Sequence, residues 1–102
     1  MYYNSKRREG IILNKKYYFI AIGGVGMSGL AKYLLENGCE VSGSDIVDSK
    51  YIDKLRKLGA TVYIGQKAEN VPSDAIVVAS TAIRENNPEM VRARELGLKV
   101  YH

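Results

Sequence analysis

The sequence predicts an α/β domain in which a five-stranded parallel sheet is covered by helices on both faces. Short apolar segments alternate with segments of helical periodicity from about residue 18 onward. Three of the expected helices end alike, with a glycine three residues before a valine of the next apolar segment. These pairs are Gly38 and Val41, Gly59 and Val62, and Gly97 and Val100. Such alternation implies parallel strands joined by right-handed crossovers.

Composition indicates one soluble globular domain. The chain has 102 residues, of which 46% are hydrophobic and 25% charged. No apolar run approaches the roughly 20 residues that a membrane-spanning helix needs, and no apolar segment of a secretory signal follows the basic N-terminus. The one cysteine, Cys39, cannot form an internal disulfide, so we expect a cytoplasmic protein with a buried, inert thiol.

The net charge of +4 is located at the N-terminus. Residues 1–16 hold five basic residues and one acidic residue, whereas the rest of the chain holds ten of each. We therefore divide the chain into a solvated basic leader, residues 1–14, and a domain, residues 15–102. A neutral domain lacks the basic face that nucleic-acid binding requires.

The first strand is expected at residues 18–22, and it leads into the pattern G-x-G-x-x-G at Gly24, Gly26 and Gly29. In this pattern the first glycine permits a tight turn, and the second leaves room for a phosphate beside the backbone. The third lets the following helix pack closely on the strand. The unpaired N–H groups at the start of that helix would face the anion. Glycines that serve packing alone are the alternative interpretation.

The helix after the loop would bury Leu30, Tyr33 and Leu34, which follow helical spacing, and would end at Gly38. A second strand at residues 40–44 then ends at Asp45. This acid stands roughly 20 residues past the loop, where the dinucleotide fingerprint has an acid on a ribose hydroxyl.

The remaining elements follow the same alternation. We expect a helix at residues 50–58, capped by Asp48 or Ser49, with Ile52, Leu55 and Leu58 on one face. A strand at 61–64, a loop or single helical turn at 67–71 and a strand at 74–79 come next. Asn87 would cap a helix that runs to residue 96, and a fifth strand would cover 98–101. The expected sheet order is 3-2-1-4-5, with the crevice at the carboxyl ends of strands one and four.

A second loop, Ser80 to Ile83, would face the glycine loop across this crevice, although a Ser-Thr pair after a strand is also common turn chemistry. Met27 would form the crevice floor. No catalytic constellation and no His or Cys spacing typical of a metal site occurs, and His102 is the last residue. We therefore predict no catalytic residue and no metal.

The segments IGGVGMSGLA and VSGSD resemble the N-terminal domain of the Mur ligase family, and most closely its L-alanine-adding members. In that family this Rossmann-like fold binds a UDP-sugar. Residues 80–83 match a Ser-Ser-Ala-Ile stretch of the family, and residues 87–89 match its Asn-Pro-Glu. Ser44, Asp45 and Asn70 also have counterparts.

The resemblance implies that the glycine loop holds the diphosphate of UDP-N-acetylmuramate. Asp45 and the loops at Gly65 and Ser80 would surround the uridine. The expected substrate-binding residues are Gly24, Val25, Gly26, Met27, Ser28, Gly29, Ser44, Asp45, Ser80, Thr81, Ala82 and Ile83.

Three positions depart from the family pattern. Gln66 replaces a histidine, so any ring stacking by that residue is lost. Ala21 replaces a common glycine, which we expect to be a mild change within a strand, and Thr81 replaces a serine but keeps its hydroxyl.

No ATP-binding loop of the form G-x-x-x-x-G-K-[ST] is present. The resemblance implies that ATP and Mg²⁺ bind to a central ligase domain that this chain lacks, together with a C-terminal domain. The chain alone would then be an inactive, substrate-binding part of a ligase of peptidoglycan biosynthesis. One rival is an NAD-binding module of a dehydrogenase or regulatory protein, although a dinucleotide normally needs six strands. The other is a small interaction domain with a vestigial loop.

Overall fold

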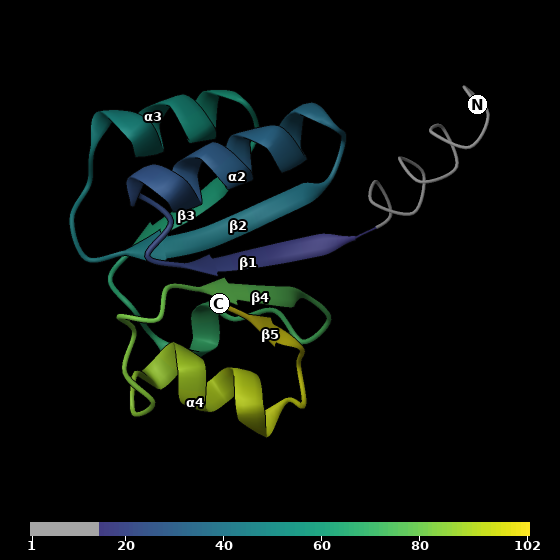
Figure 1. Cartoon of the computed structure of the whole chain (residues 1–102), viewed down its shortest axis with the longest axis vertical. Coiled ribbons are helices and arrows are strands. Elements are labelled where there is room, and N and C mark those ends of the chain that lie inside the picture. Colours follow the sequence, from purple (N-terminus) through teal and green to yellow (C-terminus); the bar gives the residue numbers. More distant parts are fainter. Residues whose placement is uncertain (1–14) are drawn as a thin grey trace.

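The computed structural model describes residues 15–102, which form three layers with a parallel sheet in the middle (Figure 1). The strands are β1 (Lys16–Ile20), β2 (Glu40–Asp45), β3 (Thr61–Ile64), β4 (Ile76–Ala79) and β5 (Val100–Tyr101). Their order, β3-β2-β1-β4-β5, and their parallel pairing confirm the predicted fold class. The predicted leader, residues 1–14, lies outside the described residues.

Helices cover both faces of the sheet. One face carries α2 (Val25–Glu36) and α3 (Lys50–Lys57), and the other carries α4 (Pro88–Glu95) with the single 3-10 turn η1 (Ala68–Asn70) (Figure 1). Side chains alternate along β1, so that Phe19 points toward α2 and α3 whereas Tyr18 and Ile20 point toward α4. All three are fully buried, as expected for the central strand of such a sheet.

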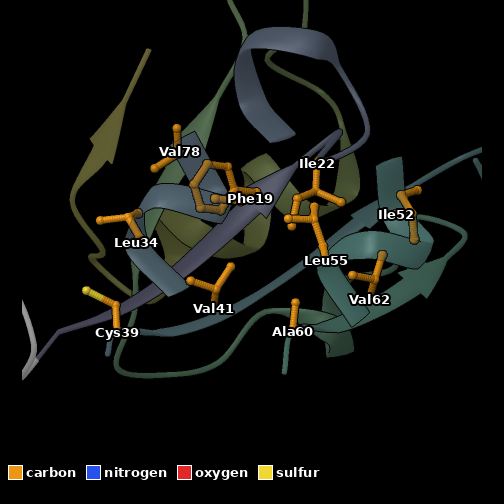
Figure 2. Packing of buried hydrophobic residues seen from close by; sticks show 11 residues of the cluster. Phe19, Ile22, Leu34, Cys39, Val41, Ile52, Leu55, Ala60, Val62 and Val78 are labelled. Atoms are coloured by element: carbon orange, nitrogen blue, oxygen red, sulfur yellow. The ribbon is translucent and has the colours of Figure 1, made fainter. Parts of the chain in front are cut away.

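Figure 2 shows the larger of the two cores, in which Phe19 and Val41 of the sheet meet Leu34 of α2 and Leu55 of α3. Cys39 lies at one end of this cluster and is buried, as predicted. Burial raises the pKa of its thiol, which favours the protonated, unreactive form.

The predicted helix signals are confirmed. Gly38, Gly59 and Gly97 have φ angles of 84°, 110° and 71°, so each supplies the left-handed residue that ends a helix. Ser49 Oγ accepts a hydrogen bond from Ile52 N, and Asn87 Oδ1 accepts one from Glu89 N. Both side chains therefore cap the helices that follow them.

The buried face of α2 differs from the prediction. Its buried residues are Ser28, Ala31 and Leu34, whereas Leu30 is 42% exposed and Tyr33 54% exposed. The helix begins at Val25, inside the glycine pattern, and its rotation places positions 28, 31 and 34 against the sheet. Leu58 is also exposed, because it is the C-cap residue of α3 and lies beyond the last turn.

The bounds of four strands also differ, that of β2 only by the inclusion of Asp45. β1 ends at Ile20, before the predicted end at residue 22, because Ala21 has a φ of 71° and leaves the extended conformation. The expectation that Ala21 is a mild change within a strand is therefore wrong. β4 begins at Ile76, where its pairing with Tyr17 of β1 starts. β5 has only two residues, because only Val100 and Tyr101 pair with β4.

We predict that Ala21→Gly stabilises the domain, because a side chain in the left-handed region is strained and glycine relieves that strain. The free energy of unfolding should rise by about 1 kcal/mol. Urea unfolding of both proteins measures the difference. The matched control is Ala79→Gly, at a buried strand position, which should lower the stability instead. An equal loss of stability at both positions would contradict the strain at Ala21.

Candidate functional site

A crevice of about 710 Å³ lies at the carboxyl ends of β1, β2 and β4, where the strand order predicts it. Three segments contribute most of its surface: the glycine loop, the end of β2 with the following turn, and the loop after β4. The lining residues are Ala21, Gly23, Gly24, Gly26, Met27, Asp45, Val47, Asp48, Ser49, Ala79, Ser80, Ala82, Ile83 and His102.

The N-terminus of α2 opens into this crevice. Its N-cap residue, Gly24, has no side chain, no acid lies in the first turn, and no side-chain capping bond is made within the described part of the chain. By contrast, Ser49 caps α3 and Asn87 caps α4. The first N–H groups of α2 therefore remain available to an anion in the crevice.

The four glycines of the loop serve different purposes. A Cβ on Gly26 would have no heavy atom of residues 15–102 within 4 Å, so this position leaves open room in the crevice. A Cβ on Gly23 would lie 2.7 Å from Asp45 Oδ2, so a side chain at this position would displace the Asp45 carboxylate. Gly24 has an ordinary φ of −63°, so the expected glycine-only turn at this residue is not observed.

Gly29 also departs from the expectation. Nothing among the described residues would touch its Cβ within 4 Å, so it does not allow close packing of α2 on the strand. Instead it borders a second cavity of about 500 Å³ between α2 and α3, together with Val25 and Ser28. These three predicted residues therefore lie on the α3 side of the helix.

Asp45 fastens the glycine loop to the end of β2. Its Oδ2 accepts a hydrogen bond of 2.7 Å from Gly23 N, and its Oδ1 accepts one of 2.8 Å from Ile46 N. The interpretation from sequence assigned Asp45 only to a ribose and missed this contact. A carboxylate has about four lone-pair positions, so hydroxyl groups of a ligand could still donate to it.

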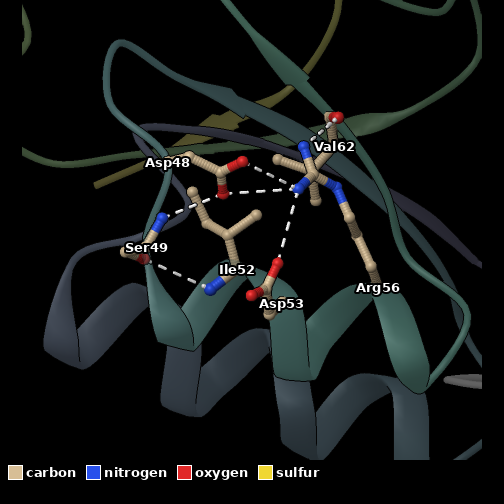
Figure 3. A network of polar contacts seen from close by, with 6 residues as sticks. All are labelled: Asp48, Ser49, Ile52, Asp53, Arg56 and Val62. Atoms are coloured by element: carbon tan, nitrogen blue, oxygen red, sulfur yellow. Dashed lines mark hydrogen bonds and ion pairs between the residues drawn. The ribbon is translucent and has the colours of Figure 1, made fainter.

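A second carboxylate, Asp48, lies on the rim of the crevice and is paired with a cation. Figure 3 shows Arg56 of α3 between Asp48, at 3.1 Å from Oδ2, and the carbonyl oxygen of Val62, to which it donates a bond of 3.1 Å. The hydrogen bond from Arg56, followed by that from Ser49 N, lowers the pKa of Asp48. The crevice rim therefore carries an ionised but paired carboxylate, which was predicted only as a possible helix cap.

The loop after β4 forms a compact turn at the opposite edge. Ser80 Oγ accepts a hydrogen bond from Ala82 N, and the Ser80 carbonyl accepts one from Ile83 N, both at 3.0 Å. Ser80, Ala82 and Ile83 line the crevice, whereas Thr81 is exposed outside its lining. The turn chemistry and the position at the crevice, which the sequence offered as alternatives, are thus both present.

Seven of the twelve predicted residues line the crevice: Gly24, Gly26, Met27, Asp45, Ser80, Ala82 and Ile83. Val25, Ser28, Gly29, Thr81 and Ser44 do not, and the assignment of all twelve to a ligand stays a prediction. Ser44 is fully buried and donates a hydrogen bond of 2.5 Å to Glu89 Oε1. Within residues 15–102, no three His, Cys, Asp or Glu side chains are grouped to hold a metal ion. In the same range, no helix is long and apolar enough to cross a membrane.

Several known proteins are similar to this chain. It is 59% identical over 86 residues to the UDP-N-acetylmuramate–L-alanine ligase of Streptomyces coelicolor, an alignment that covers 83% of this chain and 19% of that protein. It is 45% identical over 102 residues to the ligase of the same name from Carboxydothermus hydrogenoformans, covering 99% of this chain and 22% of that protein. The chain thus spans about a fifth of the length of these relatives.

Solved structures of related ligases are also similar to this chain. The UDP-N-acetylmuramate-alanine ligase of Thermotoga maritima superposes with a TM-score of 0.80 at 37% identity, covering 84% of this chain and 20% of that one. The UDP-N-acetylmuramate:L-alanyl-gamma-D-glutamyl-meso-diaminopimelate ligase of Neisseria meningitidis superposes with a TM-score of 0.73 at 31% identity. That match covers 84% of this chain and 28% of the Neisseria chain. The sequence profile of the Mur ligase family, catalytic domain, matches residues 16–102. With the predicted strand order and the glycine loop in place, the chain belongs to the Mur ligase family.

Proposed function

We propose that this chain binds UDP-N-acetylmuramate as the N-terminal, substrate-binding domain of a cytoplasmic, L-alanine-adding ligase of peptidoglycan biosynthesis. The observation that carries the proposal is the uncapped start of α2, which opens into the crevice beside the open space at Gly26. Backbone N–H groups and the positive end of a helix dipole favour a diphosphate at that place. The crevice volume of about 710 Å³ suits a ligand of this size.

The polar groups around the crevice are suited to the rest of such a ligand. Asp45 can accept a hydrogen bond from a ribose hydroxyl while it also accepts one from Gly23 N. The Ser80 hydroxyl can donate a hydrogen bond to the ligand while it accepts one from Ala82 N. The negative charge of Asp48 is offset by its ion pair with Arg56, which reduces repulsion of a diphosphate. The similarity to alanine-adding ligases favours UDP-N-acetylmuramate among nucleotide sugars.

The dinucleotide alternative has less support. NAD binds across two mononucleotide-binding halves of a six-stranded sheet, and residues 15–102 contain five strands, of which β5 has only two residues. The crevice therefore offers one phosphate-binding helix N-terminus and one acid at the end of β2, which is enough for a single nucleotide.

The chemistry of ligation requires groups that this loop does not supply. Phosphoryl transfer from ATP uses a lysine on the phosphates and a hydroxyl on Mg²⁺, and the residues after Gly29 are Leu30 and Ala31. We expect ATP and Mg²⁺ to bind in the parts of the ligase that correspond to the remaining length of the relatives. The role of this chain's residues is to bind and orient the UDP-sugar.

The first test concerns the glycine loop. Gly26→Asp should abolish binding of UDP-N-acetylmuramate, because its carboxylate would occupy and repel the place of the diphosphate. The domain should stay folded, since an acid in the first turn of a helix is favourable. Isothermal titration calorimetry measures the affinity. The control Leu30→Asp adds the same charge to an exposed position of α2 and should leave the affinity nearly unchanged.

The second test concerns the identity of the ligand. In amide NMR spectra, UDP-N-acetylmuramate should shift signals from the segment 24–29, from Asp45 and from the segment 80–83, and NAD should leave them in place. These segments surround the crevice from three sides. A response to NAD alone would replace the proposed function by the dinucleotide alternative.

The third test concerns activity. The purified chain should release no phosphate from ATP above background when UDP-N-acetylmuramate and L-alanine are present. The absence of even one electrostatic donor costs on the order of 10²–10³ in rate, and here both the cation and the metal-binding hydroxyl are missing from the loop. Turnover that disappears in Gly26→Asp would show that the chain has a complete active site.

A further inference from the structure

Glu89 is a fully buried carboxylate that connects several segments around the crevice. Its Oε1 accepts a hydrogen bond of 2.5 Å from Ser44 Oγ, at the end of β2. Its Oε2 accepts bonds from Lys67 N at 3.1 Å and from Asn70 Nδ2 at 3.0 Å, both in the segment after β3. Glu89 itself lies in the first turn of α4, so one side chain joins three parts of the chain that are distant in sequence.

The contacts of neighbouring residues make the same connection. Asn70 Nδ2 also donates to the Gly65 carbonyl, and Asn87, the cap of α4, donates from Nδ2 to Gln66 Oε1 at 2.7 Å. The start of α4 and the segment 65–70 are therefore held together by side chains from both sides. Gln66, which stands where the family has a histidine, belongs to this structural network.

The network reaches the crevice through β2. Ser44 precedes Asp45, whose carboxylate holds Gly23 N and whose carbonyl accepts a bond of 2.8 Å from Gly65 N. The Ser44 carbonyl accepts a bond of 2.8 Å from Ile22 N, next to the glycine loop. Any displacement of Ser44 would therefore move Asp45 and the start of the loop together.

We propose that Glu89 is a positioning residue for the crevice: by holding Ser44 and the segment after β3, it fixes Asp45 and the glycine loop where the ligand binds. This inference rests on the proposed function for the identity of the ligand. Glu89 touches no residue that lines the crevice in these contacts, so it acts through Ser44 and the backbone of β2.

Two substitutions separate hydrogen bonding from packing. Glu89→Met keeps the length of the side chain but removes both carboxylate oxygens. Glu89→Gln keeps one oxygen for Lys67 N and Asn70 Nδ2, and its amide can donate to Ser44 Oγ. The matched control is Tyr18→Phe, which removes a hydroxyl that is buried on the same face of the sheet and has no hydrogen-bond partner within residues 15–102.

The first measurement is amide hydrogen exchange in the free protein, which needs no ligand. Glu89→Met should lose protection at Gly23 and Gly65, whose N–H groups bond to Asp45, while the amides of β1 and β4 keep theirs. Glu89→Gln and Tyr18→Phe should resemble the wild type. Unchanged exchange at Gly23 and Gly65 in folded Glu89→Met would overturn the inference, and so would a uniform loss of protection over the whole sheet.

The second measurement is the affinity for UDP-N-acetylmuramate. It should fall about tenfold in Glu89→Met, since the three hydrogen bonds that Glu89 accepts are lost, and should recover to within about threefold in Glu89→Gln. Equal losses of affinity in Glu89→Met and Glu89→Gln would overturn a role based on hydrogen bonding. If the wild-type chain does not bind this ligand, the proposed function fails, and the exchange measurement still decides the role of Glu89.

Discussion

The contact between Gly23 and Asp45 is the constraint on which the crevice depends. Gly23 N donates a hydrogen bond of 2.7 Å to Asp45 Oδ2, and a Cβ at position 23 would lie 2.7 Å from the same oxygen, so a side chain there would displace the carboxylate. This bond ties the turn after β1 to the end of β2 and so fixes where α2 begins. The uncapped start of α2 then lies at the crevice beyond the carboxyl ends of β1, β2 and β4. A change in this single contact would alter the direction of the helix, the depth of the crevice and the position of the acid together.

Much of the fold could be predicted because local signals and topology agree. Glycines with positive φ ended the helices where expected, Ser49 and Asn87 capped α3 and α4, and alternation of strands and helices led to the observed strand order. The crevice followed from that order alone, since ligands of such sheets lie where the order reverses. The sequence thus predicted the place of the site better than it predicted the orientation of each residue within it.

The remaining features depend on packing between segments that no local pattern encodes. The G-x-G-x-x-G motif predicts close packing at its third glycine, but the rotation of α2 turns Gly29 toward α3. Ser44 was expected at the ligand because it matches a serine of the family, and strand alternation points it to the opposite face, where its hydroxyl donates a hydrogen bond to Glu89. Ala21 lies in an apolar run, and only the geometry of the turn reveals its positive φ. In each case the rotation of a helix, the facing of a strand residue or the backbone conformation depended on the tertiary structure.

In the proposed function, the crevice and the buried cluster around Glu89 have different roles. On the crevice side, glycines and unpaired N–H groups leave open space and donors for a ligand. On the α4 side, both carboxylate oxygens of the buried Glu89 accept hydrogen bonds from within the domain. Such groups hold their positions, because breaking one of these bonds leaves a buried polar atom unpaired at a cost of about 1–3 kcal/mol. Rigid support behind an open site reduces the ordering that a ligand must impose when it binds. If the domain orients the UDP-sugar as proposed, a rigid polar network behind the crevice would serve that role better than reactive groups inside it.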